Sequence, residues 1–202
     1  MSSLIIHLYI GKKIIEKYNY SNSFLLGEIM PDIIKITGTK KEITHYMKND
    51  REYDLSLYIN NNLKENITDE NLGYFAHLLQ DKLFDKYLET RAVPVYKNNK
   101  KYAKYLYNDM IVEEQDFMDR LYDEYAIFDN ILISEHGFDF NKIKDIILKE
   151  NKYNEYTNVI KEQLIKHPVI KYNNMELLQK DKLFEYINNC VLEYDKYVNN
   201  IK

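Results

Sequence analysis

Apolar residues recur at helical spacing along much of this chain. The clearest run lies between about residues 70 and 88, where the apolar positions repeat every three or four residues: Leu72, Phe75, Ala76, Leu79, Leu83 and Tyr87. Such a stripe predicts an amphipathic helix. Thr68 and Asp69 precede it and are the candidate N-terminal caps, because the side-chain oxygen of either can accept a hydrogen bond from a free backbone N–H.

Other apolar runs predict further helices over residues 4–18, 55–61, 99–125, 141–164 and 175–198. Ser2 or Ser3 should cap the first, and a break is expected near Asn151. A short helix from Phe24 should stop before Pro31, because the residue ahead of a proline is disfavoured in the helical region. Residues 126–134 fit either a short strand or a buried helix. The pattern as a whole predicts an all-α multi-helix bundle.

Composition and charge remove several classes of protein. The chain has 28 Lys and Arg against 32 Asp and Glu, a net charge of −4, which argues against a nucleic-acid partner. The single cysteine, Cys190, excludes an internal disulfide scaffold and a cysteine zinc finger. No apolar run approaches the ~20 residues of a membrane span, and the N-terminal charges are in the wrong order for a signal peptide. We therefore expect a cytoplasmic protein with no stable membrane insertion.

The first candidate functional residues lie on the strongest predicted helix. His77 and Asp81 are four residues apart, which places their side chains on one face, about 5–6 Å apart. This spacing fits two ligands of one metal ion, and it also fits a surface pair worth a few tenths of a kcal/mol. Gly73, one turn earlier, costs about 1 kcal/mol inside a helix. Its presence predicts the close approach of another backbone or a ligand.

Three more polar residues interrupt apolar segments: His7, Asp32 and His45. A buried carboxylate without a partner costs several kcal/mol, so Asp32 implies a cation or strong hydrogen bonds. Each residue alone fits a hydrogen-bonded core position. Five such residues within the first 81 favour a metal cluster.

In order and spacing, these segments resemble the zinc-dependent phospholipase C family, especially its uncharacterised bacterial relatives. The resemblance covers residues 1 to about 88 and is carried by His7, by Phe24–Ile33 (FLLGEIMPDI), by His45–Met47 and by Gly73–Asp81 (GYFAHLLQD). It implies an all-α fold around a buried metal site. The ligands that it implies are His7, Asp32, His45, His77 and Asp81.

The chain also departs from that family. Secreted members use a processed N-terminal amine as a ligand and carry a later His-x-x-x-Glu helix, whereas neither His136 nor His167 is followed by Glu at that distance. We therefore expect one or two ions rather than three. Asp109, Asp116 and Asp119 are candidate replacement ligands, with Asp109 the first choice, although a solvated acid on a helix surface is the more common case.

The ligand types define the expected chemistry. Three imidazoles and two carboxylates suit zinc first, with manganese or iron as alternatives, rather than calcium or magnesium. Ions bridged by Asp81 or Asp32 would activate water for hydrolysis of a phosphoester, with Asp32 and Asp81 as the catalytic residues. The expected substrate is a small phosphoester or a phospholipid headgroup. Two acids are candidate general bases, Glu28 and Asp54. Four basic residues are candidates for attracting a phosphate group to the site: Lys35, Lys40, Lys41 and Arg51.

We expect a single helical domain over residues 1–202, with a metal-binding core at 1–125 and a C-terminal helical cover at 126–202. The cover is also the expected interface of a possible homo-oligomer. The alternative to a phosphoesterase is an all-α binding or interaction protein with a structural or degenerate metal site. An HD-type phosphohydrolase is disfavoured, because the chain has no adjacent His-Asp pair. A catalytic ion needs an open position, which a structural ion lacks.

Overall fold

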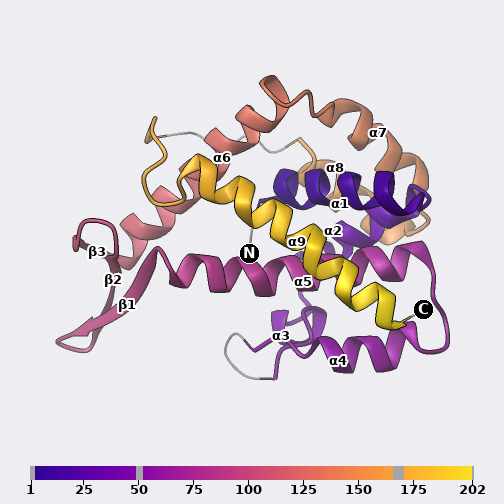
Figure 1. Cartoon of the computed structure of the whole chain (residues 1–202), viewed down its shortest axis with the longest axis horizontal. Helices are drawn as coiled ribbons and strands as arrows, with labels where there is room; N and C mark the ends of the chain where they lie inside the picture. The colour runs from indigo at the N-terminus through magenta and orange to yellow at the C-terminus, as the bar shows by residue number, and fades with distance from the viewer. Residues whose placement is uncertain (1–2, 49–51, 166–170, 202) are drawn as a thin grey trace.

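The computed structural model describes residues 3–48, 52–165 and 171–201, which form a mostly helical protein with one small sheet (Figure 1). The predicted helical class is confirmed, and the sheet is an addition to it. The elements in chain order are α1 (Leu4–Tyr18), α2 (Ser23–Ile36), α3 (Lys41–Thr44), α4 (Leu55–Tyr58), a π turn (Ile59–Leu63), α5 (Asp69–Glu89), β1 (Ala92–Lys97), β2 (Lys100–Tyr105), β3 (Ile111–Glu113), α6 (Glu114–Ser134), α7 (Phe140–Glu150), a 3-10 turn (Asn154–Tyr156), α8 (Thr157–Gln163) and α9 (Lys180–Ile201).

The two strongest predictions of helix starts are confirmed. The Ser3 hydroxyl accepts a hydrogen bond from the N–H of Ile6 and caps α1, whereas Ser2 lies outside the described residues. The Thr68 hydroxyl accepts from the N–H of Asn71 and caps α5. These caps satisfy backbone groups that the first turn leaves free.

The predicted stop before Pro31 is wrong, because α2 continues through the proline to Ile36. A proline inside a helix costs about 3 kcal/mol, since it removes the hydrogen bond to the carbonyl four residues earlier and crowds that turn. Every side chain from Phe24 to Pro31 is buried, however. Packing on both sides of α2 therefore outweighs the local preference.

Helices α2 and α5 cross at two glycines. A Cβ atom on Gly27 would lie 2.0 Å from the carbonyl oxygen of Glu70, and one on Gly73 would lie 2.0 Å from that of Phe24. Only hydrogen fits at either position. The close approach of a backbone predicted at Gly73 is confirmed, and it brings the side chains that follow Gly73 against α2.

The predicted helix over residues 99–125 is wrong in its first half, where the chain forms an antiparallel sheet in the order β1-β2-β3. Asn98 and Asn99 both have positive φ and form the two-residue turn between Lys97 and Lys100. This turn matches the right-handed twist of a hairpin, and Asn tolerates its left-handed backbone. Residues 126–134, left open between strand and helix, belong to α6.

The C-terminal helices cover the N-terminal ones. In Figure 1, α9 lies across α5 and α1, and both contacts are present in the structure. Helices α7 and α8 contact α2, with the predicted interruption at Asn151, while α9 begins at Lys180, later than predicted. Helix α6 runs without a break past residue 125, where we set the boundary between core and cover. Among the described residues, no helix is both long and apolar enough to cross a bilayer.

Candidate metal centre

The structure brings the five predicted ligands into one cluster. His7 comes from α1, Asp32 from α2, His45 from the residue after α3, and His77 and Asp81 from α5. His7, His45, His77 and Asp81 are at most 1% exposed, whereas the Asp32 side chain is 24% exposed. Four segments separated along the chain therefore meet in the core.

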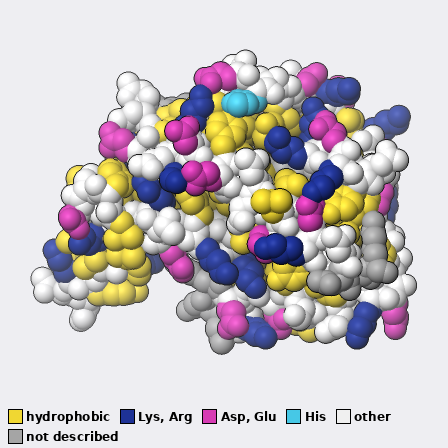
Figure 2. All heavy atoms as spheres, in the orientation of Figure 1, with side chains coloured by type: hydrophobic (Ala, Val, Ile, Leu, Met, Phe, Trp, Pro, Cys, Tyr) yellow, Lys and Arg dark blue, Asp and Glu magenta, His cyan; other side chains and the backbone are white. Residues whose placement is uncertain are grey.

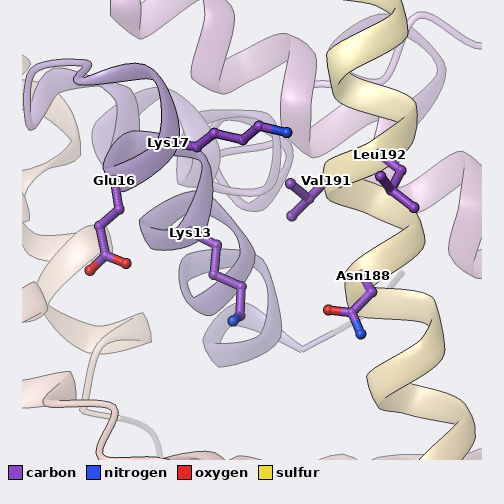
Figure 3. A pocket seen from close by; sticks show the side chains of 6 residues that line it. All are labelled: Lys13, Glu16, Lys17, Asn188, Val191 and Leu192. Atoms are coloured by element: carbon purple, nitrogen blue, oxygen red, sulfur yellow. The ribbon is translucent and has the colours of Figure 1, made fainter.

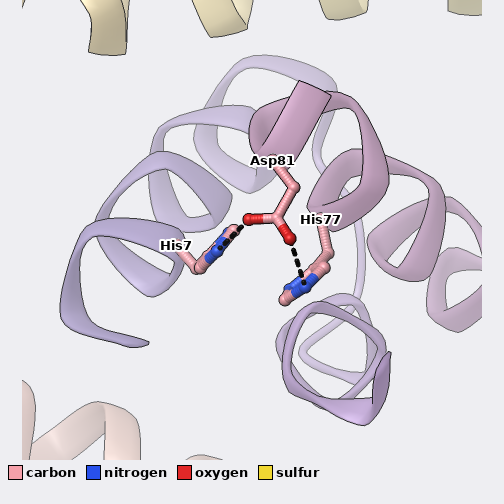
Figure 4. A group of neighbouring side chains, drawn as sticks. All are labelled: His7, His77 and Asp81. Atoms are coloured by element: carbon pink, nitrogen blue, oxygen red, sulfur yellow. Dashed lines mark ion pairs between the residues drawn. The ribbon is translucent and has the colours of Figure 1, made fainter. Parts of the chain in front are cut away.

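One half of the cluster is formed by His7, His77 and Asp81 (Figure 4). The Nε2 atom of His7 lies 3.3 Å from Oδ1 of Asp81, and the Nε2 atom of His77 lies 3.8 Å from Oδ2. The carboxylate thus offers one oxygen to each imidazole. The spacing of four on α5 places both of its side chains on one face of the helix, where His77 also contacts α2 through the carbonyl of Glu28.

The other half is formed by Asp32, His45 and His77. His45 Nε2 lies 3.5 Å from Asp32 Oδ1, 3.5 Å from Asp81 Oδ2 and 3.4 Å from His77 Nε2. In each half, the three candidate ligand atoms lie within 4.8 Å of one another. His77 belongs to both halves, and Asp81 faces both.

All three imidazoles are held through Nδ1. His77 Nδ1 donates to the backbone carbonyl of Glu28 at 2.7 Å, and His7 Nδ1 donates to Gln80 Oε1 at 2.8 Å. His45 Nδ1 lies 2.7 Å from the hydroxyl of Thr44. A hydrogen bond at one ring nitrogen fixes the ring and frees the other nitrogen as a metal ligand. Here every Nε2 faces the cluster.

Two buried atoms of the cluster lack hydrogen-bond partners within the described part of the chain, namely His7 Nε2 and Asp81 Oδ1. An unsatisfied buried polar atom costs about 1–3 kcal/mol. A cation between these two atoms would satisfy both. The donor set and the orphaned atoms therefore fit a metal ion such as zinc.

The electrostatics of the cluster suit metal binding. Burial, followed by the neighbouring His7, lowers the pKa of His77 to about 3, so this ring is neutral at pH 7. Burial alone would raise the pKa values of Asp32 and Asp81, but nearby positive charge and hydrogen bonds from the imidazoles outweigh it and hold both well below the usual value. Neutral imidazoles and ionised carboxylates are the forms that bind metals.

A cleft of about 750 Å³ opens beside Asp32. Its walls come from α5, α6 and the β1–β2 hairpin and are largely apolar. Among the described residues, the charged ones that line it are two lysines and five acids: Lys41, Lys101, Asp32, Asp85, Glu89, Glu114 and Asp129. Figure 2 shows hydrophobic side chains gathered over the sheet end of the molecule. Of the five cluster residues, Asp32 is the one that lines this cleft within the described chain.

A second hollow has no such chemistry. A shallow groove of about 620 Å³ lies between α1 and α9 (Figure 3), lined by Lys13, Glu16, Lys17, Asn188, Val191 and Leu192. Lys17 pairs with Asp195, and the groove contains none of the cluster residues. The candidate site is therefore the cluster with the cleft beside Asp32.

The predicted replacement ligands do not join the cluster. Asp109, in the turn before β3, is 82% exposed and pairs with Lys104. Asp116 is exposed, and Asp119 pairs with Lys171. The interpretation of these acids as ligands is therefore wrong, because the hairpin and the start of α6 hold them at the surface.

The other expected residues are dispersed. Asp54 caps α4 and pairs with Lys48, so it does not reach the cluster as a general base. Lys35 pairs with Asp32 at 2.6 Å. Lys41 lines the cleft and Lys40 is exposed, while Arg51 and His167 lie outside the described residues.

Sequence reasoning missed two residues beside the cluster. Gln80, 1% exposed, bonds both His7 and Glu28, and Tyr53, 3% exposed, donates to Asp81 Oδ2 at 3.5 Å. Gln80 carried a usable signal, since it lies three residues after His77 and one before Asp81. Tyr53 carried none that separates it from the other 19 tyrosines.

Comparisons with family models, with curated proteins and with solved structures found no match. The functional argument therefore depends on the residues of the cluster and the cleft.

Proposed function

We propose that this protein is a metal-dependent phosphoesterase whose centre is held by His7, Asp32, His45, His77 and Asp81. One observation carries the proposal. Three imidazole Nε2 atoms and two carboxylates converge in the core, and the Nδ1 atom of each imidazole is hydrogen-bonded to a neighbouring group. His7 Nε2 and Asp81 Oδ1 lie 3.3 Å apart and are buried without hydrogen-bond partners in the described chain, which supports a cation between them.

The division of the cluster into two triads supports a centre for one or two ions. Asp81 directs Oδ1 toward His7 and Oδ2 toward His45, as a bridging carboxylate would. Zinc is the first choice for three imidazoles and two carboxylates, with manganese or iron next. When bound, such ions lower the pKa of water toward about 7 and neutralise charge on a phosphoryl group.

The cleft supports a role for Asp32 at the boundary between centre and substrate. Its side chain joins the His45 triad and also lines the cleft. Lys41 lies on the same cleft, where its ammonium would attract phosphoryl oxygens. The apolar walls would hold the organic part of a small phosphoester or a phospholipid headgroup. Resemblance to the zinc-dependent phospholipase C family supports the same chemistry and a phospholipase C-like fold.

The alternative is a binding or interaction protein in which the metal is structural. It is favoured by the near-complete burial of His7, His45, His77 and Asp81, because structural sites are closed by protein ligands. The 24% exposure of Asp32 on the cleft favours catalysis, because a catalytic ion needs an open position.

Hydrolysis of bis(p-nitrophenyl) phosphate and p-nitrophenyl phosphate tests the two functions. The protein would be stripped with chelator and reloaded with Zn²⁺ or Mn²⁺. We expect reloading to produce activity, Asp32→Asn to lose it, and the surface variant Asp119→Asn to retain it. Stoichiometric metal without activity toward either substrate would support the structural alternative.

A further inference from the structure

Glu28 lies on α2, on the Nδ1 side of the stacked imidazoles of His7 and His77, and is completely buried. Its backbone carbonyl accepts from His77 Nδ1 at 2.7 Å, and its Oε2 lies 4.0 Å from His7 Nδ1. Both contacts are on the Nδ1 side of the rings, whereas Asp81 lies on the Nε2 side. This position argues against the expected role of Glu28 as a general base.

The Glu28 carboxyl group determines which end of the Gln80 amide faces His7. The Gln80 NH₂ group donates to Glu28 Oε1 at 2.8 Å, so the Gln80 carbonyl oxygen is turned toward His7 Nδ1, also at 2.8 Å. An amide oxygen only accepts, so His7 must carry its proton on Nδ1. With the amide reversed, the proton would move to Nε2 and block the position that a metal needs.

The backbone of Glu28 acts on the other ring. Pro31 removes the hydrogen bond that the carbonyl of Gly27 would accept within α2, and its ring crowds the preceding turn. The next carbonyl, that of Glu28, bonds His77 Nδ1. One residue therefore contacts His77 directly and His7 through Gln80.

Packing does not account for a carboxyl group at this position. Oε2 of Glu28 lacks a hydrogen-bond partner among the described residues, and burying such an atom costs stability. Helix α1 also provides space for it, since a Cβ atom on Gly11 would lie 3.1 Å from Glu28 Cγ and Oε1. An apolar side chain would fill the space without that cost.

We infer that Glu28 is a positioning residue of the metal centre, which sets the tautomer of His7 through Gln80 and the ring orientation of His77 through its backbone carbonyl. The inference rests on the proposed metal centre. Because the two effects use different atoms of Glu28, changes to the side chain alter only the His7 half.

Titration of the full chain with Co²⁺, followed by visible absorption and by competition with a chelator, tests this inference. Glu28→Met keeps the length of the side chain and removes the acceptor. Gln80→Met breaks the same relay and leaves Glu28 in place, so it decides the question if Glu28→Met does not fold. Glu28→Gln is the conservative control, because its amide oxygen can still accept from Gln80.

We expect Glu28→Met and Gln80→Met to weaken Co²⁺ binding by about 10- to 100-fold at the His7 half and to change its spectrum. Glu28→Gln should restore affinity and spectrum. The His45→Ala variant loses a ligand of the other half and so shows which Co²⁺ binding step belongs to that half. Glu28→Met and Gln80→Met should leave the affinity of that step unchanged. Thermal unfolding of the metal-free variants shows whether lost affinity merely follows lost stability.

Two results would overturn the inference. In the first, both methionine variants bind Co²⁺ with the affinity and spectrum of the parent protein. In the second, Glu28→Gln weakens Co²⁺ binding as much as Glu28→Met does, and the Co²⁺ affinity of both halves falls in parallel with the melting temperature. If the parent protein itself binds no Co²⁺, the proposed metal centre fails first, and the inference fails with it.

Discussion

The imidazole rings of His7 and His77 stack face to face, with centroids 4.1 Å apart and planes inclined by 10°. They come from α1 and α5 and are held by different acceptors, Gln80 and the backbone of Glu28. Two positive charges at this separation in a buried site would repel strongly. Burial and the adjacent His7 together lower the pKa of His77 to about 3.

This pKa predicts a pH dependence for the metal-free protein. Unfolded His77 takes up a proton near pH 6.5, whereas the folded protein resists protonation until about pH 3. The contribution of His77 to stability is therefore present above about pH 6.5 and is lost as the pH falls, by about 1.4 kcal/mol per pH unit.

Urea unfolding with chelator at pH 7.5, 6.0 and 5.0 measures this contribution. The buried Asp129 makes the free energy of unfolding change in the opposite sense over part of this pH range. The prediction therefore concerns the difference in unfolding free energy between the parent protein and His77→Gln, whose glutamine does not titrate. The parent protein should lose stability relative to His77→Gln as the pH falls. A difference in unfolding free energy that stays constant with pH would refute the lowered pKa of His77.

Asp129 should destabilise the protein at neutral and higher pH. Burial raises the pKa of its carboxyl group to about 7, although Ser3 donates a hydrogen bond to it. A raised carboxyl pKa gives stability below about pH 4 that is lost as the pH rises through 7. Asp129→Asn should therefore raise the melting temperature at pH 8, by about 2–4 °C per kcal/mol recovered, and have little effect near pH 4. An equal effect at both pH values would contradict this prediction.

Gly73→Ala tests the crossing of α2 and α5. Helix propensity alone predicts that this change stabilises the protein by about 1 kcal/mol. The added Cβ would overlap the carbonyl of Phe24, so we expect the free energy of unfolding to fall by about 1–3 kcal/mol instead. The sign of the change, measured by urea unfolding, distinguishes the two.

The buried carboxylate of Glu124 should hold the segment before α9. It accepts from the backbone N–H groups of Glu176, Leu177 and Leu178 and from Arg120 Nε, at 2.6–3.0 Å. Glu124→Gln replaces one acceptor oxygen with a donor and removes the charge. We expect a loss of about 2–5 kcal/mol in urea unfolding, with Co²⁺ affinity unchanged. The variant Asp119→Asn weakens a partly exposed pair with Lys171 and should lose at most about 1 kcal/mol.

Local features were predictable from the sequence, whereas tertiary choices were not. The caps at Ser3 and Thr68 depend only on a side chain and the first helical turn. The stop predicted before Pro31 was wrong, because the burial that keeps α2 helical comes from other helices, above all α5, which the sequence around Pro31 does not reveal. The hairpin was missed although Asn98 and Asn99 mark its turn, since the apolar positions around them also fit a helix.

The five cluster residues could be found because polar side chains inside apolar segments are costly without partners. What holds them could not be found in the same way. Gln80 lies 73 residues from His7 and 52 from Glu28 along the chain, and Gly27 and Gly73 allow the helices that carry Glu28 and Gln80 to cross closely.

Elemental analysis of the protein purified without chelator is the most direct test of the metal centre. The account predicts one or two equivalents of a transition metal, zinc first, in the parent protein. His77→Ala and Asp81→Ala should lose this metal, and the exposed-site variant His136→Ala should keep it. Folded parent protein that carries no stoichiometric metal and takes up none from added Zn²⁺, Mn²⁺ or Fe²⁺ would contradict the account.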